Sequence, residues 1–272
     1  MDVNSLTSLL SELPVPQIRY FETIGSTNDE ALAWIQAGSQ DGCLVIADQQ
    51  TQGRGRLNRR WITHPGAALA LSLILQPTAG EIDRLEFFSP LGALAICQAL
   101  EELYGLNPQI KWPNDVLLQG RKIAGILVET AWLGDRLQGM VIGIGVNVKL
   151  EAVPPASELL FPASCVEDAA EGAVDRPALL REIVRALFVW RSKIRGEDFR
   201  QAWEQRLAFR GQWVRIEGTG SAPVTGKLHG IDASGNLLLR STAGETISIT
   251  VGDVHLRPAQ LHQAIDIYNN RR

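Results

Sequence analysis

The chain is short of the residues that usually bind metals or form disulfides. Its 272 residues include four histidines and three cysteines, Cys43, Cys97 and Cys165. The cysteines are far apart and show no paired spacing, which argues against both a disulfide framework and a zinc site. Such cysteine usage suits a reducing compartment, so we expect a cytoplasmic protein.

Long apolar runs and an excess of positive charge are also missing. No uninterrupted apolar stretch approaches the roughly 20 residues of a membrane span. The opening residues, Met1-Asp2-Val3-Asn4, lack the basic and apolar regions of a signal peptide. The formal net charge is −4, so we do not expect a nucleic-acid footprint over the whole surface. Any anion site must therefore be local.

Hydrophobic periodicity predicts a mixture of strands and helices over the first 209 residues. Strands are expected at 18–22, 44–47, 67–75, 109–111, 122–129 and 140–148, the last two forming a hairpin. Helices are expected at about 27–38, 87–104, 176–194 and 198–209. Thr27 and Glu30 have the spacing of a capping box at the start of the first helix. Residues 151–176 are expected to be mostly loop.

The pattern changes from residue 211 onward to short strands separated by Gly, Ser and Asp turns. These strands are expected at 212–217, 224–231, 236–240 and 246–251. Such spacing is typical of a small barrel. We therefore expect two domains, residues 1–209 and 210–260, followed by a polar tail at 261–272.

A loop rich in glycine and arginine follows the predicted strand 44–47. It contains Gly53-Arg54-Gly55-Arg56 and two further arginines, Arg59 and Arg60. Glycine lets a backbone lie close to a ligand, and arginine offers a planar fork to carboxylates and phosphates. Four arginines within seven positions repel one another unless an anion joins them, so we expect a loop that is mobile when empty. A solvated basic loop is the alternative interpretation.

This loop matches neither of two common nucleotide-binding motifs. It lacks the Lys-Ser/Thr ending of a P-loop. Asn58 stands where the dinucleotide-binding fingerprint requires its third glycine.

Other candidate residues lie where predicted strands and helices end. Lys111 and Asp115 flank a tight Trp-Pro-Asn turn beside a core strand. Ser26 and Thr27 open a helix, where a hydroxyl either caps the helix or receives a polar ligand. Three glycines inside the predicted hairpin mark either bulges or a surface that another group approaches closely. They are Gly125, Gly143 and Gly145.

Taken together, these motifs resemble those of biotin–protein ligases. In order they are Gly25-Ser26-Thr27-Asn28, Gly53-Arg54-Gly55-Arg56 with Arg59 and Trp61, Lys111-Trp112-Pro113-Asn114-Asp115, Lys122 to Glu129, and Gly143 to Asn147. Their order and spacing match the family across roughly residues 18–258. The resemblance implies an α/β (α+β) fold, with a mixed-sheet catalytic domain of the biotin/lipoate ligase type followed by an SH3-like β-barrel.

The resemblance also implies a two-step reaction. The carboxylate of biotin attacks the α-phosphate of ATP, giving biotinyl-5'-AMP and pyrophosphate, with Mg²⁺ present. The ε-amine of one lysine on a biotin carboxyl carrier domain then attacks the mixed anhydride. Preorganised positive charge would bring the two anions together, and a closing loop would protect the adenylate from water.

Roles for individual residues follow from the same resemblance. Lys111 and Arg54 are the expected catalytic residues, with Lys111 bridging the carboxylate and the α-phosphate. The expected biotin-binding residues are Ser26, Thr27, Asn28, Gln49, Arg54, Gly55, Arg56, Lys111 and Gly125. The expected contacts of ATP or the adenylate are Arg56, Arg59, Trp61, Asn114, Lys122 and Asn147. Trp61 is an equally good candidate for a core anchor, and Asp115 is the expected Mg²⁺ ligand.

Some family members carry an N-terminal winged helix-turn-helix and act as repressors. Only about 17 residues precede the first predicted strand, too few for such a unit, so we expect no DNA binding. We also expect no membrane association, and a homodimer through the sheet edge stays open.

Two alternative functions remain. A lipoate or octanoate ligase or transferase shares the fold, although the Gly-Arg-Gly-Arg-x-x-Arg-x-Trp loop argues against it. A non-catalytic nucleic-acid-binding module is disfavoured by the acidic net charge.

Overall fold

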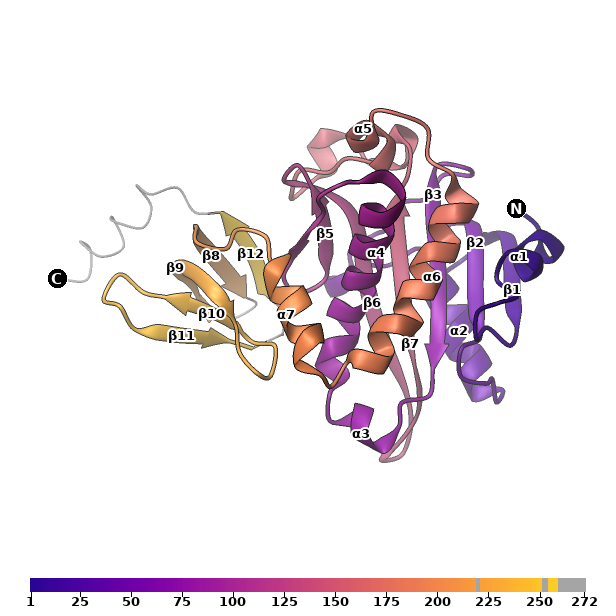
Figure 1. The fold of residues 1–272 in the computed structure, drawn as a ribbon, viewed down its shortest axis with the longest axis horizontal. Coiled ribbons are helices and arrows are strands. Elements are labelled where there is room, and N and C mark those ends of the chain that lie inside the picture. The colour runs from indigo at the N-terminus through magenta and orange to yellow at the C-terminus, as the bar shows by residue number, and fades with distance from the viewer. Residues whose placement is uncertain (219–220, 251–253, 259–272) are drawn as a thin grey trace.

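A computed structural model of the chain describes residues 1–218, 221–250 and 254–258 (Figure 1). The predicted polar tail, 261–272, lies outside the described residues. The described chain builds a large mixed sheet covered by helices, with a smaller sheet beside it. None of the described helices has the length and apolar composition of a membrane span.

The large sheet has seven strands, in the order β1-β2-β3-β7-β6-β5-β4. Only the β1–β2 pair is parallel, and the other neighbours are antiparallel. The strands are β1 (Ile18–Ile24), β2 (Leu44–Gln50), β3 (Ala68–Leu75), β4 (Gln109–Lys111), β5 (Asp115–Leu118), β6 (Arg121–Leu133) and β7 (Arg136–Asn147). The predicted mixed sheet is confirmed, and its central hairpin, β6–β7, extends several residues beyond the predicted bounds.

Helices cover both faces of the large sheet, which explains why its central strands are apolar on both sides. All eight residues of β3 are buried. The helix α4 (Phe88–Tyr104) and the helix α6 (Arg176–Lys193) lie together on one face, and α2 (Thr27–Gln36) lies on the other.

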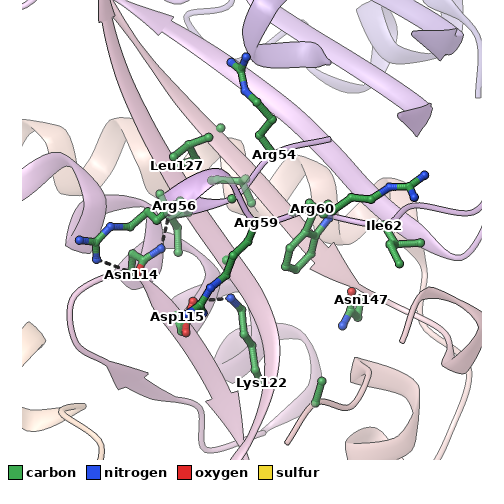
Figure 2. A pocket seen from close by; sticks show the side chains of 18 of the residues that line it. Arg54, Arg56, Arg59, Arg60, Ile62, Asn114, Asp115, Lys122, Leu127 and Asn147 are labelled. Atoms are coloured by element: carbon green, nitrogen blue, oxygen red, sulfur yellow. Dashed lines mark hydrogen bonds and ion pairs between the residues drawn. The ribbon is translucent and has the colours of Figure 1, made fainter. Parts of the chain in front are cut away.

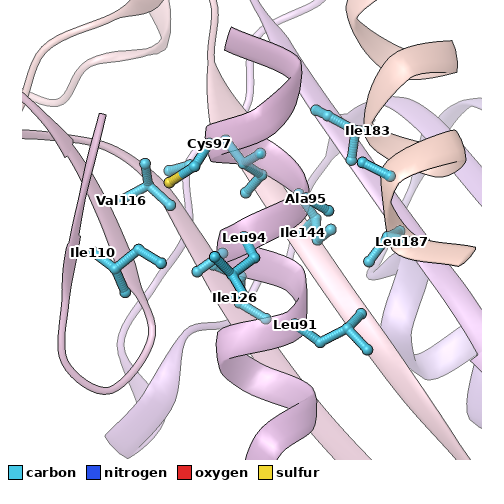
Figure 3. Packing of buried hydrophobic residues seen from close by; sticks show 14 of the residues in the cluster. Leu91, Leu94, Ala95, Cys97, Ile110, Val116, Ile126, Ile144, Ile183 and Leu187 are labelled. Carbon is cyan, nitrogen blue, oxygen red and sulfur yellow. The ribbon is translucent and has the colours of Figure 1, made fainter. Parts of the chain in front are cut away.

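Figure 3 shows the core between α4 and the hairpin β6–β7. Leu91 and Leu94 of α4 belong to the same cluster as Ile126 and Ile144 of the sheet, and all four side chains are buried. Each such side chain contributes about 1.5–3 kcal/mol when it is fully removed from water. The helix ends at Gly105, whose φ of +62° is easily reached only without a side chain.

The remaining helical segments are short. They are α1 (Val3–Leu9), α3 (Ala79–Ile82), α5 (Val166–Ala170) and α7 (Glu197–Gln205), with 3₁₀ turns at η1 (Arg56–Asn58), η2 (Leu85–Phe87), η3 (Leu150–Ala152) and η4 (Ala156–Glu158). The helix α7 stops earlier than predicted, because the chain leaves it to pair with β4. The backbone N–H of Ala208 donates to the carbonyl of Ile110 over 2.9 Å.

The capping-box prediction for α2 is wrong by one residue. The N-cap is Ser26, whose hydroxyl accepts the backbone N–H of Asp29 over 3.4 Å. Thr27 is already the first helical residue. Its hydroxyl is therefore directed elsewhere, into the cavity described below.

The small sheet has five antiparallel strands, in the order β11-β10-β9-β8-β12. They are β8 (Trp213–Gly218), β9 (Ser221–Ile231), β10 (Leu237–Arg240), β11 (Thr246–Ile249) and β12 (Val254–Pro258). The predicted all-β unit at this end of the chain is confirmed. Among the described residues, β11 and β12 form the two edges and do not pair, so closure into a barrel stays a prediction.

Candidate active site

A cavity of about 380 Å³ opens where four parts of the large domain meet. Its walls are the start of α2, the arginine loop, the turn between β4 and β5, and the glycine-bearing stretches of β6 and β7. Residues 152–163 close another side. This volume is in the usual range for small-molecule sites.

The structure brings together almost all of the residues that the sequence nominates. The nominated residues that line the cavity are Ser26, Thr27, Asn28, Arg54, Gly55, Arg56, Arg59, Trp61, Lys111, Asn114, Asp115, Lys122, Gly125 and Asn147. Figure 2 shows several of them converging from separate elements. Gln49 is the exception.

Gln50, and not Gln49, reaches the cavity. Successive side chains of a strand point to opposite faces, so only one of two adjacent glutamines can do so. The Gln50 Oε1 accepts the Thr27 backbone N–H over 2.8 Å and lies 3.0 Å from the Thr27 hydroxyl. Gln49 is approached on the outer side by the Thr23 hydroxyl, 3.4 Å away. The nomination of Gln49 is therefore replaced by Gln50.

A buried polar network forms one end of the cavity. The Ser72 hydroxyl lies 2.6 Å from the Asn28 Oδ1 and 2.8 Å from the Thr27 hydroxyl. The Asn28 amide in turn donates to the Glu129 carboxylate over 2.7 Å. Gly143 makes room for this arrangement, because a Cβ there would lie 2.1 Å from the Asn28 Oδ1. The close approach predicted at this glycine is made by a protein side chain.

Two lysines and one carboxylate occupy the middle of the cavity wall. The Lys111 Nζ lies 2.8 Å from one Asp115 oxygen, and the Lys122 Nζ lies 2.5 Å from the other. Burial by itself would raise the pKa of Asp115, but the charges of Lys122 and Lys111 outweigh it and hold that pKa well below its usual value. Asp115 is therefore ionised at neutral pH and positions both ammonium groups.

This geometry does not fit Asp115 as a magnesium ligand. Both of its oxygens already accept from ammonium groups. The described residues also contain no cluster of three or more His, Cys, Asp or Glu side chains that could hold a metal ion.

The aromatic wall of the cavity is Trp61. Its indole packs against β7 at Gly145, where a Cβ would come within 2.3 Å of the ring. Gly125, the cross-strand partner of Gly145, would meet the same ring at 3.3 Å. The Lys122 Nζ is 5.5 Å from the ring centroid. The indole N–H is buried and has no hydrogen-bond partner among the described residues.

Two asparagines of the nominated set support the backbone around the cavity. The Asn114 amide donates to the Ile126 carbonyl over 2.9 Å, and its oxygen accepts from Arg56 over 3.4 Å. The buried Asn147 donates to the Ser164 carbonyl over 3.1 Å. Both side chains thereby tie the hairpin β6–β7 to neighbouring segments.

The arginine loop, residues 53–60, folds over the cavity as a small flap. The Gly55 N–H donates to the Arg59 carbonyl over 2.7 Å, and the Trp61 N–H donates to the Gly53 carbonyl over 2.8 Å. The Arg54 guanidinium points away from Arg56 and Asn114 (Figure 2) and pairs with Asp29 and Glu129. The expectation that the flap needs a bound anion for counter-charge is therefore wrong for Arg54, whose carboxylate partners come from α2 and β6.

Three residues that the sequence did not nominate belong to this site. They are Gln50, Ser72 and Glu129. Ser72 carried a signal, since it is the one polar residue in the apolar run of β3. Glu129 ends the Lys122 to Glu129 motif. Its partners, Asn28 and Arg54, lie far from it in the sequence, so no local pattern indicated these contacts.

The small sheet contacts the turn that carries Lys111. The indole N–H of the buried Trp112 donates to the Gly235 carbonyl over 3.1 Å. Gly235 has a φ of +76°, and a Cβ there would lie 2.9 Å from the Trp203 ring. The turn at residues 232–236 thus packs between two tryptophans and supports the cavity from behind.

Comparisons with known proteins agree with this geometry. Residues 20–147 match the biotin/lipoate A/B protein ligase family, and residues 210–257 match the biotin protein ligase C-terminal domain.

Two curated relatives and one solved structure show the extent of the similarity. The biotin–[acetyl-CoA-carboxylase] ligase of Paracoccus denitrificans is 37% identical over 230 residues, which span 82% of this chain and 93% of that protein. The bifunctional ligase/repressor BirA of Bacillus subtilis is 32% identical over 87% of this chain and 73% of its own length. The Aquifex aeolicus biotin protein ligase, solved with biotin and ATP, aligns with a TM-score of 0.78 and 28% identity, covering 90% of this chain and all of that one. The chain belongs to the biotin–protein ligase family.

Proposed function

We propose that this chain joins biotin to ATP as biotinyl-5'-AMP, releases pyrophosphate, and then transfers biotin to one lysine of a biotin carboxyl carrier domain. The observation that carries the proposal is the division of one cavity into two ends. One end has fixed neutral hydrogen-bonding groups, and the other has lysine and arginine side chains.

The neutral end suits the ureido ring of biotin. That ring offers two N–H donors and one carbonyl acceptor, and it needs partners that are already fixed in place. Ser26, Thr27, Asn28 and Gln50 supply hydroxyls and amides there. Their mutual hydrogen bonds, together with Ser72, hold them in position before a ligand arrives.

The cationic end suits the meeting of a carboxylate and an α-phosphate. Two anions must approach within bonding distance, and the negative charge on the leaving pyrophosphate must be stabilised. The ammonium groups of Lys111 and Lys122 each contact a different oxygen of the Asp115 carboxylate. Their positive charge is therefore already in place, and little reorganisation is needed during the reaction. Arg56 and Arg59 of the flap line the same end.

The flap and Trp61 would protect the adenylate once it has formed. A mixed anhydride is hydrolysed by water, so the enclosed site must exclude water until the carrier lysine arrives. Mg²⁺ enters this proposal with the triphosphate of the substrate, and no step here depends on a protein ligand for it. The three buried cysteines form no disulfide, as is usual for a protein of the reducing cytoplasm.

Mass spectrometry of a carrier domain tests the proposal. The protein is incubated with biotin, MgATP and a biotin carboxyl carrier domain, and the carrier should gain the mass of one biotinyl group. A carrier whose acceptor lysine is replaced by arginine should gain none, and Lys111→Ala should nearly abolish the gain. A mass gain with lipoate and none with biotin would overturn the proposal in favour of a lipoate ligase.

A further inference from the structure

The guanidinium of Arg54, the first arginine of the flap, is held at the edge of the cavity by two carboxylates. The Arg54 Nη2 lies 2.6 Å from an Asp29 oxygen and 3.0 and 3.1 Å from the two Glu129 oxygens. Asp29 comes from the first turn of α2, and Glu129 from the middle of β6. A guanidinium bonded to two carboxylates from separate elements fixes the base of the flap to the rigid body of the domain.

Backbone hydrogen bonds close the flap into a small hairpin that begins beside this arginine. Arg54 pairs through its backbone with Arg60, so both ends of the flap meet beside it. The neighbouring bonds, Gly55 to Arg59 and Trp61 to Gly53, close the same small hairpin. Fixing the Arg54 side chain therefore fixes residues 53–60, and it also fixes the entry of Trp61 into the cavity.

Glu129 also makes a second contact, and this one leads into the cavity. One of its oxygens accepts the Asn28 amide over 2.7 Å. The Asn28 oxygen in turn lies 2.6 Å from Ser72, in the network that ends at Thr27 and Gln50. A continuous chain of hydrogen bonds thus connects the base of the flap with the neutral end of the cavity.

We propose that Arg54, Asp29 and Glu129 form a clasp that holds the flap closed, and that Glu129 couples this clasp to Asn28 at the neutral end of the cavity. Arg54 and Glu129 are then positioning residues whose effect is to retain the adenylate. The inference rests on the proposed function, and it replaces the expectation that Arg54 binds the carboxylate of biotin.

The coupling has a simple physical basis. The Arg54–Asp29 contact is half exposed, so on its own it is weak. The contacts of Glu129 are stronger, because its carboxylate accepts hydrogen bonds from the Arg54 guanidinium and from the buried Asn28 amide at the same time. A ligand that immobilises Asn28 would also immobilise Glu129 in the position that receives Arg54. Closure of the flap would then depend on filling the neutral end.

The lifetime of the enzyme-bound adenylate tests the clasp. Adenylate is formed from biotin and MgATP without a carrier, and its escape and its hydrolysis by water to AMP and biotin are followed over time. Glu129→Gln and Arg54→Met should each shorten the lifetime on the order of 10-fold. The double variant should be no worse than either single variant, because both remove the same clasp. A purely structural defect would instead lower adenylate formation and adenylate lifetime together.

A matched control and a milder variant keep the test decisive. Arg181→Met removes an arginine paired with the exposed Glu12, away from the cavity, and should leave the lifetime unchanged. Asp29→Asn removes only one exposed contact and should shorten the lifetime about threefold even where Glu129→Gln folds poorly. Additive effects in the double variant would overturn the clasp. Loss of adenylate formation in Arg54→Met, together with a normal lifetime in Glu129→Gln, would also overturn it.

Amide hydrogen exchange separates failure of the clasp from failure of the proposed function. In ligand-free protein, Arg54→Met and Glu129→Gln should each raise the exchange of residues 53–60 about 10-fold over the wild type. Arg181→Met should not. Unchanged exchange would overturn the clasp, whatever reaction the protein catalyses. If the two variants exchange faster than the wild type, but the wild type makes no adenylate, only the proposed function would be overturned.

Discussion

At the scale of single residues, the alternation of β2 decides which glutamine serves the cavity. Gln50 accepts two hydrogen bonds from Thr27 and lines the cavity, whereas Gln49 faces Thr23 on the outer side. A buried polar partner that is lost costs about 1–3 kcal/mol, which corresponds to a 5- to 150-fold change in an equilibrium constant.

Gln50→Ala should therefore weaken biotin binding by at least about 5-fold, while Gln49→Ala should change it less than about twofold. Isothermal titration calorimetry with biotin measures both. ATP binding should be affected less than biotin binding in either variant, because Gln50 lies at the neutral end. Equal losses from the two substitutions would show that the strand faces the other way or that neither residue contacts biotin.

Asp115 is the residue whose ionisation matters most for the cationic end. Its pKa is lowered, so its contribution to stability is present above the unfolded-state value of about 4 and is lost as the pH falls below it. Asp115→Asn would leave two ammonium groups without their shared carboxylate.

We expect Asp115→Asn to lower the free energy of unfolding by about 2 kcal/mol at pH 7. The difference from the wild type should shrink as the pH is lowered from about 4 toward 3. Chemical denaturation of both proteins across this range measures it. A difference that stays constant with pH would mean that the Asp115 charge does not stabilise the fold.

At the scale of elements, the flap is a part of the site that is mostly exposed or half-buried. It is tied to the domain by the clasp, by a few backbone hydrogen bonds and by Trp61. Ordering backbone costs about 1–2 kcal/mol per residue. A bound carboxylate and phosphate would add counter-charge for the arginines that line the cavity.

Residues 53–60 should exchange their amide hydrogens more slowly when biotin and a non-hydrolysable adenylate analogue are bound than when the protein is empty. Because the clasp already holds the flap in part, we expect a graded change of about 10-fold or more, without complete disorder in the empty state. Hydrogen exchange with mass spectrometry measures it. Residues 68–75 of β3 are the internal control, and identical exchange of the flap in both states would remove its gating role.

At the scale of the whole molecule, the small sheet contacts the turn that follows Lys111. Trp112 stands directly after Lys111 in the chain, and its indole N–H is bonded to Gly235 of the β9–β10 turn. The two sheets therefore meet immediately behind the cavity. We therefore expect the small sheet to affect the reaction by holding the turn that joins Lys111 to Asn114.

Trp112→Phe keeps an aromatic ring at this buried position, but it removes the donor and part of the packed volume, and should cost at least about 1–2 kcal/mol of stability. The rate of adenylate formation should fall several-fold, with little change in biotin affinity, since the neutral end lies elsewhere. Thermal unfolding and pyrophosphate release measure the two effects. A normal rate in a destabilised variant would confine the contact to stability.

The sequence by itself determined the elements and the chemistry they carry. Apolar runs predicted β2, β3, β6 and β7, because burial on both faces demands them. The ordered motifs predicted the family and most of the cavity-lining residues. These properties depend on short stretches of chain, and local periodicity reports them well.

The tertiary structure alone decided how those residues are partnered. It selected Gln50 over Gln49, because the face of a strand is known only once its neighbours are in place. It paired Arg54 with Glu129, 75 residues away, and Trp112 with Gly235, 123 residues away. It also placed Asp115, the predicted Mg²⁺ ligand, between the ammonium groups of Lys111 and Lys122. Each of these contacts joins segments that only the topology of the two sheets brings together, and no local pattern records which distant group will arrive.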